Sequence, residues 1–168
     1  MKRIVLIYIF LFSFVQILPA QNISIEGLRK DYGKVRKDSV SCAKVYAKVK
    51  KSSSQDNTIN AYKGAIIASM ANYSKVKEEK IGLFKEGKQL LEKAIASDNN
   101  NVELRFLRMT IQTNCPKALG YNKEIENDKK LILSKLSSIK DPGLKNMMSE
   151  FLLDSKFVSE KEKSELKG

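Results

Sequence analysis

The chain has no histidine, no tryptophan and only two cysteines among its 168 residues. Without histidine it cannot form a Ser-His-Asp or Cys-His nucleophilic site, use an imidazole as a general base, or bind zinc through imidazole. Two cysteines are too few for a four-thiolate metal site or an iron–sulfur cluster. These absences favour a protein that is not an enzyme and that holds neither a metal nor a cofactor.

Glycine and proline are also scarce, with eight and three residues. A turn-rich β fold would need more of both, so the composition favours helices. Apolar residues recur at spacings of three and four in nearly every segment, and no stretch alternates with period two. We therefore expect an all-α fold, an antiparallel array of about six or seven helices.

The long apolar run at the N-terminus has the layout of a signal peptide. Lys2 and Arg3 precede an apolar stretch over residues 4–18, and Pro19 and Ala20 follow it. The stretch is about 15 residues long, shorter than the roughly 20 that a membrane-spanning helix needs. We expect cleavage after Ala20 and export to the periplasm or the cell exterior, with an uncleaved anchor as the alternative.

Basic residues outnumber acidic ones, 31 to 19, which gives a net charge of +12. Without residues 1–20 the chain keeps 29 basic and 19 acidic residues, a net charge of +10. Residues 21–51 alone contain nine Lys or Arg and three acidic residues. Such a segment suits anionic lipid headgroups, acidic glycan or an acidic protein, or it forms a solvated face. Nucleic acid is an unsuitable partner for an exported protein.

The chain divides into a signal peptide, 1–20, and a single α-helical domain, 21–168. Within the domain we expect basic helices over 21–51, a core helical array over 58–153, and a short C-terminal helix or tail over 154–168. The polar run over 51–57, with three consecutive serines, is the clearest loop. Apolar stripes predict helices over residues 25–35, 42–49, 58–73, 77–97, 102–114, 121–139 and 142–152.

Two of these helices have unusual faces. The helix expected over 58–73 has a ridge of small residues, which allows a neighbouring axis to approach closely. The ridge consists of Ala61, Gly64 or Ala65, Ala68 and Ala71. The helix expected over 102–114 has apolar residues on two opposed sides, such as Leu107 and Phe106. A helix of that kind is packed between two layers.

Parts of this helical region resemble known sequence patterns. The stretches Ala61-Tyr62-Lys63-Gly64-Ala65, Phe84-Lys85-Glu86-Gly87 and Leu90-Leu91-Glu92-Lys93-Ala94-Ile95 resemble degenerate tetratricopeptide-type helix pairs. Downstream, the chain resembles small exported Bacteroidota proteins of unassigned function. That likeness lies in Asn101-Val102-Glu103-Leu104-Arg105-Phe106-Leu107-Arg108, Gln112, Pro116, Leu119-Gly120-Tyr121 and Asp128-Lys129.

The resemblance covers about residues 58–139 and departs from the full tetratricopeptide pattern. The chain has no tryptophan, no proline among the residues directly after Ile95 and no clear self-similarity at the period of that repeat. What the resemblance implies is a right-handed helical array and, by analogy, a surface that binds a peptide or a protein.

Four charged residues form a candidate polar cluster. Glu103, Arg105 and Arg108 lie on the helix expected over 102–114, and Asp128 lies within the apolar stripe of the next helix. A lone carboxylate is costly there, and arginine is its bidentate partner. We expect an ion pair that locks the two helices, with Glu103 joining it. The alternative is an arginine pair open to a groove, where it binds an anionic group such as a peptide C-terminus.

Tyr62 and Tyr73 lie on the large-residue ridge of the helix expected over 58–73. They are candidate groove aromatics, with core packing as the competing explanation. Cys42 and Cys115 both lie on apolar stripes. Buried free thiols and a Cys42–Cys115 disulfide, which an oxidising compartment favours, both fit this placement.

The sequence thus predicts a non-enzymatic, exported helical domain of the cell envelope that works as an interaction or scaffold module. Its partner would be an unknown protein or peptide. The alternative is an anion binder that uses the lysine-rich N-terminal helices. Ionic strength separates the two, because an electrostatic binder is released by salt.

Overall fold

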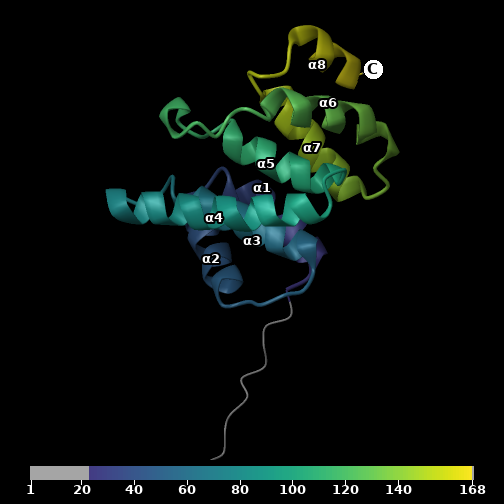
Figure 1. Ribbon diagram of the computed structural model, residues 1–168. Helices are drawn as coiled ribbons and strands as arrows, with labels where there is room; N and C mark the ends of the chain where they lie inside the picture. Colours follow the sequence, from purple (N-terminus) through teal and green to yellow (C-terminus); the bar gives the residue numbers. More distant parts are fainter. Residues whose placement is uncertain (1–22, 168) are drawn as a thin grey trace, which may run out of the picture.

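The computed structural model describes residues 23–167, and every regular element in that range is helical (Figure 1). The α-helices are α1 (Ile25–Val35), α2 (Ser39–Lys50), α3 (Asn57–Met70), α4 (Lys77–Ser97), α5 (Val102–Gln112), α6 (Ile125–Lys135), α7 (Pro142–Asp154) and α8 (Glu160–Lys167). Two 3-10 helices, η1 (Lys117–Leu119) and η2 (Leu136–Ser138), precede and follow α6. The all-α prediction is confirmed, with eight α-helices in 23–167 because the short C-terminal segment is also helical. The expected signal peptide lies outside the described residues.

Side-chain caps explain where most of these helices begin. Backbone N–H groups in the first turns donate to the side chains of Ser24, Asp38, Asp56, Asn101 and Asp141. Each of these residues satisfies a donor that has no partner inside the helix. By contrast, the N-cap position of α4 is occupied by Val76, whose side chain makes no capping hydrogen bond.

Helices α3 and α4 form the tightest helix pair. A Cβ on Gly64 would lie 2.7 Å from the carbonyl oxygen of Gly87 and from the backbone nitrogen of Leu91. A Cβ on Gly87 would collide with the backbone of Gly64 and Ala68. Residues later in α3 therefore face residues earlier in α4, as in an antiparallel pair. The expected ridge of small residues brings the two backbones into direct contact.

Helix α5 is buried on almost every side, as its two apolar faces predict. It packs against α3, α4 and α6. On its α7 side, the rings of Phe106 and Phe151 meet edge to face, with centroids 5.5 Å apart. The helix therefore connects the α3–α4 pair to the C-terminal helices.

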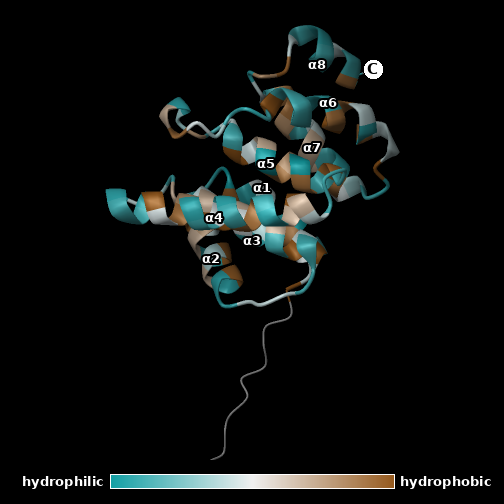
Figure 2. Cartoon of the chain, viewed as in Figure 1, coloured by the Kyte–Doolittle hydropathy of each residue, from teal (hydrophilic) through white to brown (hydrophobic). Residues whose placement is uncertain are grey.

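The basic N-terminal helices share the same core. Helix α1 contacts α2, α3 and α7, and α2 contacts α3. Tyr32, Val35 and Cys42 are fully buried within them. Figure 2 shows α8, by contrast, as hydrophilic along most of its length, and none of its residues is buried.

The region before α6 differs from the sequence prediction of one helix over 121–139. Gly120 takes a left-handed conformation, φ 62°, and the chain reaches Ile125 before α6 begins. Tyr121 lies in this connection, yet it is buried, and its ring meets Phe84 of α4 edge to face at 5.7 Å. Its apolar spacing therefore reflects packing on α4 and not membership of α6.

Candidate binding groove

A groove of about 690 Å³ lies between α3, α4 and the end of α5. The N-terminal half of α4 forms one wall, and the segment with η1 forms the other. In Figure 1, that end of α4 projects to the left, below the loop that carries η1. The volume lies within the range of ligand-binding sites. We call this feature the α3–α4–α5 groove.

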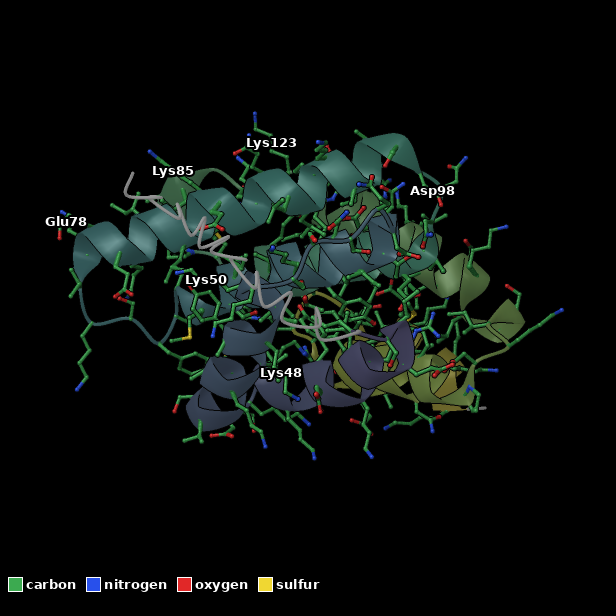
Figure 3. The ribbon with its side chains drawn as sticks, turned by 90° about the horizontal axis from the view of Figure 1, so that it is seen from below. Lys48, Lys50, Glu78, Lys85, Asp98 and Lys123 are labelled. Carbon is green, nitrogen blue, oxygen red and sulfur yellow. The ribbon has the colours of Figure 1, made fainter. Side chains whose placement is uncertain are left out.

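The α4 side of the groove is basic. It presents Lys77, Lys80, Lys85 and Lys88, which together are called the lysine wall below. Arg36, directly after α1, also lines the groove, and no Asp or Glu is among the lining residues. In Figure 3, Lys85 projects from α4 on the side opposite Lys50 of α2. The lysine wall is therefore separate from the basic surface of α2.

The floor of the groove is largely apolar. Three apolar residues are buried beneath it: Ala68 of α3, Ala71 directly after α3, and Ile111 of α5. Above them, Ile81 of α4 and Leu119 of η1 are 39% and 47% exposed. The groove therefore leaves large apolar side chains in contact with water on both of its walls.

The polar groups on the floor differ in whether their hydrogen-bonding capacity is already satisfied within the protein. The Ser69 hydroxyl donates to the carbonyl oxygen of Ala65, and the Thr110 hydroxyl donates to that of Leu107. The side-chain amide of Asn114 donates once, to Thr110, which leaves its carbonyl oxygen open. Asn72 lines the groove as an exposed residue. These two amides can donate to and accept from a bound ligand.

Of the two candidate groove aromatics, only Tyr73 lines the groove. Its hydroxyl lies 3.4 Å from the carbonyl oxygens of Val35 and Arg36, at the end of α1. Tyr62 is fully buried, and its ring meets Tyr32 edge to face at 5.5 Å. Tyr62 is therefore a core residue, because its side chain contacts Tyr32 of α1 and Glu103 of α5.

Cys115 lines the groove, whereas Cys42 is fully buried in the core between α1, α2 and α3. Both are free thiols, so the structure does not have the disulfide that the sequence left open. Burial raises the pKa of Cys42 to about 11 and also raises that of Cys115. Both groups are therefore protonated at neutral pH, and neither is an activated nucleophile.

The predicted polar cluster is brought together only in part. Asp128 of α6, fully buried, accepts hydrogen bonds of 2.8 Å from both Nε and Nη2 of Arg108. Nε of Arg105 lies 2.7 Å from Asp128 Oδ1. The expected ion pair between the two helices is thus present. We call Arg105, Arg108 and Asp128, with Glu92 of α4, the α5–α6 network.

This network also reaches α4. Arg108 donates to Glu92 at 3.1 Å, and the hydroxyl of Tyr121 donates to the other oxygen of Glu92. Burial raises the pKa of Asp128, and it outweighs the opposite effect of the neighbouring guanidiniums. Burial also opposes the charge on Arg108, but its bonds to Asp128 and Glu92 raise the pKa of Arg108. This charge network connects α4, α5 and α6, and both guanidiniums in it are paired with carboxylates of the protein itself.

Glu103 does not join that network, contrary to expectation. It lies on the other polar edge of α5, where it accepts bonds of 2.7 and 2.6 Å from Arg29 of α1. The buried hydroxyl of Tyr62 donates to it at 2.8 Å, and Arg29 also donates to Asp141 at 2.9 Å. Residues 103 and 105 project from different edges of the helix, so α1 and not α6 provides the partner of Glu103.

The lysine wall and the exposed apolar residues of the groove were not predicted from the sequence. Within α4 the buried positions, such as Leu83, Gly87 and Leu91, follow one stripe. Ile81 lies off that stripe, which was the available signal that α4 has a second apolar surface. The contribution of η1 had no such signal, because it depends on the turn at Gly120.

Two further findings concern what the described chain lacks. Among residues 23–167 no three Cys, Asp or Glu side chains are grouped so that they could hold a metal ion. In the same range, no helix has both the length and the apolar character needed to cross a membrane.

Comparison with known proteins gives no match to this chain, whether with protein families, with curated proteins or with solved structures.

Proposed function

We infer that this protein is a non-enzymatic interaction domain that binds a segment of a partner protein in the α3–α4–α5 groove. The observation that carries the proposal is the exposed apolar surface there. Four large apolar side chains are exposed in residues 23–167, and two of them, Ile81 and Leu119, line this groove. Apolar side chains concentrated in a concave, open site favour ligand binding over a merely solvated surface.

The chemistry of the lining supports binding rather than catalysis. The groove contains lysines, amides and a protonated thiol, but it has no carboxylate that could act as a general base. The chain has no histidine to replace one. The two arginines of the α5–α6 network are bonded to carboxylates and leave no charged group poised for reaction.

A peptide-display selection tests this function. The chain from Gln21 to Gly168, which contains all the described helices, is immobilised and exposed to a library of random peptides. We expect a family of related peptides to be enriched, and to lose binding when Ile81→Glu and Leu119→Glu are combined. Both residues are exposed, so these substitutions leave the core intact.

Val40→Glu is the matched control, because Val40 is 74% exposed on α2 and does not line the groove. It adds the same kind of charge at an exposed apolar position. Failure to enrich any peptides, or equal loss of binding in Val40→Glu, would exclude the groove as an interaction site.

A second candidate function uses the basic surface of α1 and α2. Their lysines are exposed, for example Lys34 and Lys37 on and after α1 and Lys44 and Lys48 on α2. Such a surface suits lipid headgroups or acidic glycan at the cell envelope. Vesicles that contain phosphatidylglycerol would bind to this surface at low ionic strength and be released by salt.

The proposal also includes export and a tetratricopeptide-like arrangement of helix pairs. Export is supported by the apolar stretch over residues 4–18 with its basic start and Ala20. The repeat-like arrangement is supported by the antiparallel α3–α4 pair, whose contact at Gly64 lies within the stretch that resembles such repeats. In such arrays, stacked helix pairs create extended concave surfaces for partners.

A further inference from the structure

We propose that the occupant of the α3–α4–α5 groove is an acidic amphipathic peptide segment of a partner protein. This inference rests on the proposed function and specifies the chemistry of the partner. The segment would place apolar side chains against the floor, Ile81 and Leu119, and its Asp or Glu side chains against the lysine wall.

The charge of the lining is of one sign. Every charged residue that lines the groove is basic: Arg36, Lys77, Lys80, Lys85 and Lys88. The acidic residues of this part of α4, Glu78, Glu79 and Glu86, are not among the lining residues, and Glu79 accepts a hydrogen bond of 2.6 Å from Ser74. A concave site lined by one sign of charge concentrates ligands of the opposite sign.

None of these five cations forms an ion pair in the described part of the chain. Arg36 lies over the ring of Phe151 and Lys88 over the ring of Tyr121, whereas Lys77, Lys80 and Lys85 have neither kind of partner there. Elsewhere the protein pairs its buried cations closely, as Arg108 with Asp128 shows. The groove therefore keeps a set of positive charges available for carboxylates that the chain itself does not provide.

The spacing of the lysine wall suits a chain segment better than a small anion. Lys77 and Lys88 are eleven positions apart on one helix. At 1.5 Å per residue they span about 16 Å, and a compact anion cannot reach both ends. About five residues of an extended peptide, or three turns of a helix, cover that length.

The floor favours a peptide over an acyl chain. Asn72 and Asn114 line the groove, and the side-chain carbonyl oxygen of Asn114 accepts no hydrogen bond from the described residues. Primary amides can donate to and accept from peptide bonds. An acyl chain offers them no partner and would leave them desolvated. A peptide therefore uses both the apolar and the polar parts of the floor.

The test repeats the peptide selection with a variant that reverses the charge of the lysine wall. The wild-type chain should enrich peptides that combine Asp or Glu with Leu, Ile or Phe. In Lys80→Glu/Lys85→Glu, the best of these peptides should bind about a hundredfold more weakly, and peptides with Lys or Arg should be enriched instead. Both lysines are exposed, so the variant should keep the helical circular dichroism and melting temperature of the wild type.

Lys44→Glu/Lys48→Glu is the matched control, because it changes the net charge equally on α2, outside the groove. It should leave the acidic peptides bound. Equal weakening in this control would overturn the proposal, since only overall charge would then matter.

Other outcomes separate the two proposals. The enriched peptides could instead be neutral or basic and still require Ile81 and Leu119. That result would refute the acidic partner but would still support the proposed function as an interaction domain. If no peptides are enriched, both proposals fail. Oleate that displaces a bound acidic peptide at equal concentration would identify the groove as a lipid site and would also refute the inference.

Discussion

Gly64 of α3 and Gly87 of α4 bring two helix backbones into direct contact, with no space for a side chain between them. A Cβ added to Gly64 would lie 2.7 Å from the carbonyl oxygen of Gly87. One added to Gly87 would meet the carbonyl oxygen of Gly64 in turn. Because α4 also forms the basic side of the groove, this contact fixes the position of the lysine wall relative to the floor.

Gly64→Ala should lower the free energy of unfolding by about 2 kcal/mol, because the added methyl group forces α3 and α4 apart. Urea denaturation followed by circular dichroism measures the effect. Gly82→Ala is the control, since a Cβ at Gly82 meets nothing within 4 Å. It should raise the free energy of unfolding by up to about 1 kcal/mol through helix propensity. Equal effects of the two substitutions would contradict the close contact.

Asp128→Ala should lower the free energy of unfolding by about 3 kcal/mol and clearly reduce the melting temperature. The substitution leaves the buried guanidinium of Arg108 without its carboxylate. Glu160→Ala removes an exposed ion pair with Lys163 and should cost less than about 1 kcal/mol. An unchanged melting temperature for Asp128→Ala would mean that the network serves a function other than stability.

The hydrogen bonds to Glu103 predict that two substitutions lower the free energy of unfolding by different amounts. Tyr62→Phe removes one hydrogen bond to Glu103 and keeps the ring in the core, so it should cost about 1 kcal/mol. Glu103→Ala also breaks the two bonds from Arg29 and should cost about 3 kcal/mol. Thermal denaturation of the two variants in parallel checks the order. The reverse order would show that the existing bond from Arg29 to Asp141 is enough to compensate the guanidinium.

The thiols should differ in reactivity. At about pH 8 a maleimide should modify Cys115 in the native protein and leave Cys42 unmodified, since Cys42 is fully buried with a pKa raised to about 11. Both thiols should react after unfolding in urea without a reductant. Cys115→Ser should abolish the native labelling. If no thiol reacted until a reductant was added, the two cysteines would be joined by a disulfide.

Export predicts the N-terminus of the mature protein. Expressed with its own leader in a bacterial host, the chain should be recovered from the periplasm with Gln21 as its first residue. Mass spectrometry of the intact protein measures the cleavage position. Ala20→Leu should impair cleavage, because signal peptidases require a small residue there. Retention of the full-length chain in the membrane by the wild type would indicate an uncleaved anchor.

Much of the fold could be predicted because its signals are local. The stripe spacing marked most helices, and Asp141 before Pro142 marked the start of α7. The small residues around Gly64 predicted a close helix contact, and the two apolar faces of α5 predicted its central place. The conformation of the region before α6 could not be predicted from such local signals. Tyr121 has helical spacing from Ile125, but its packing against Phe84 decides its conformation.

The polar residues were harder to predict because their partners are distant in sequence. Asp128 was recognised as needing an arginine, and the arginines on α5 provided it. The partner of Glu103 is Arg29, 74 positions earlier, and no periodicity links the two. The groove likewise combines α3, α4 and η1, so its lining emerges only from the tertiary structure.

The missing cap of α4 has a consequence for motion. Val76 precedes the helix without a side-chain hydrogen bond to its first turn, and it is 55% exposed. An uncapped helix end frays on a fast timescale, and its amide hydrogens exchange with solvent early. Lys77 and Lys80 lie on this first turn, which we expect to fray, whereas Lys88 lies beside the close backbone contact at Gly87. A bound peptide segment would therefore order the N-terminal end of the lysine wall. Slower amide exchange in the first turn of α4 would then indicate that the segment has bound.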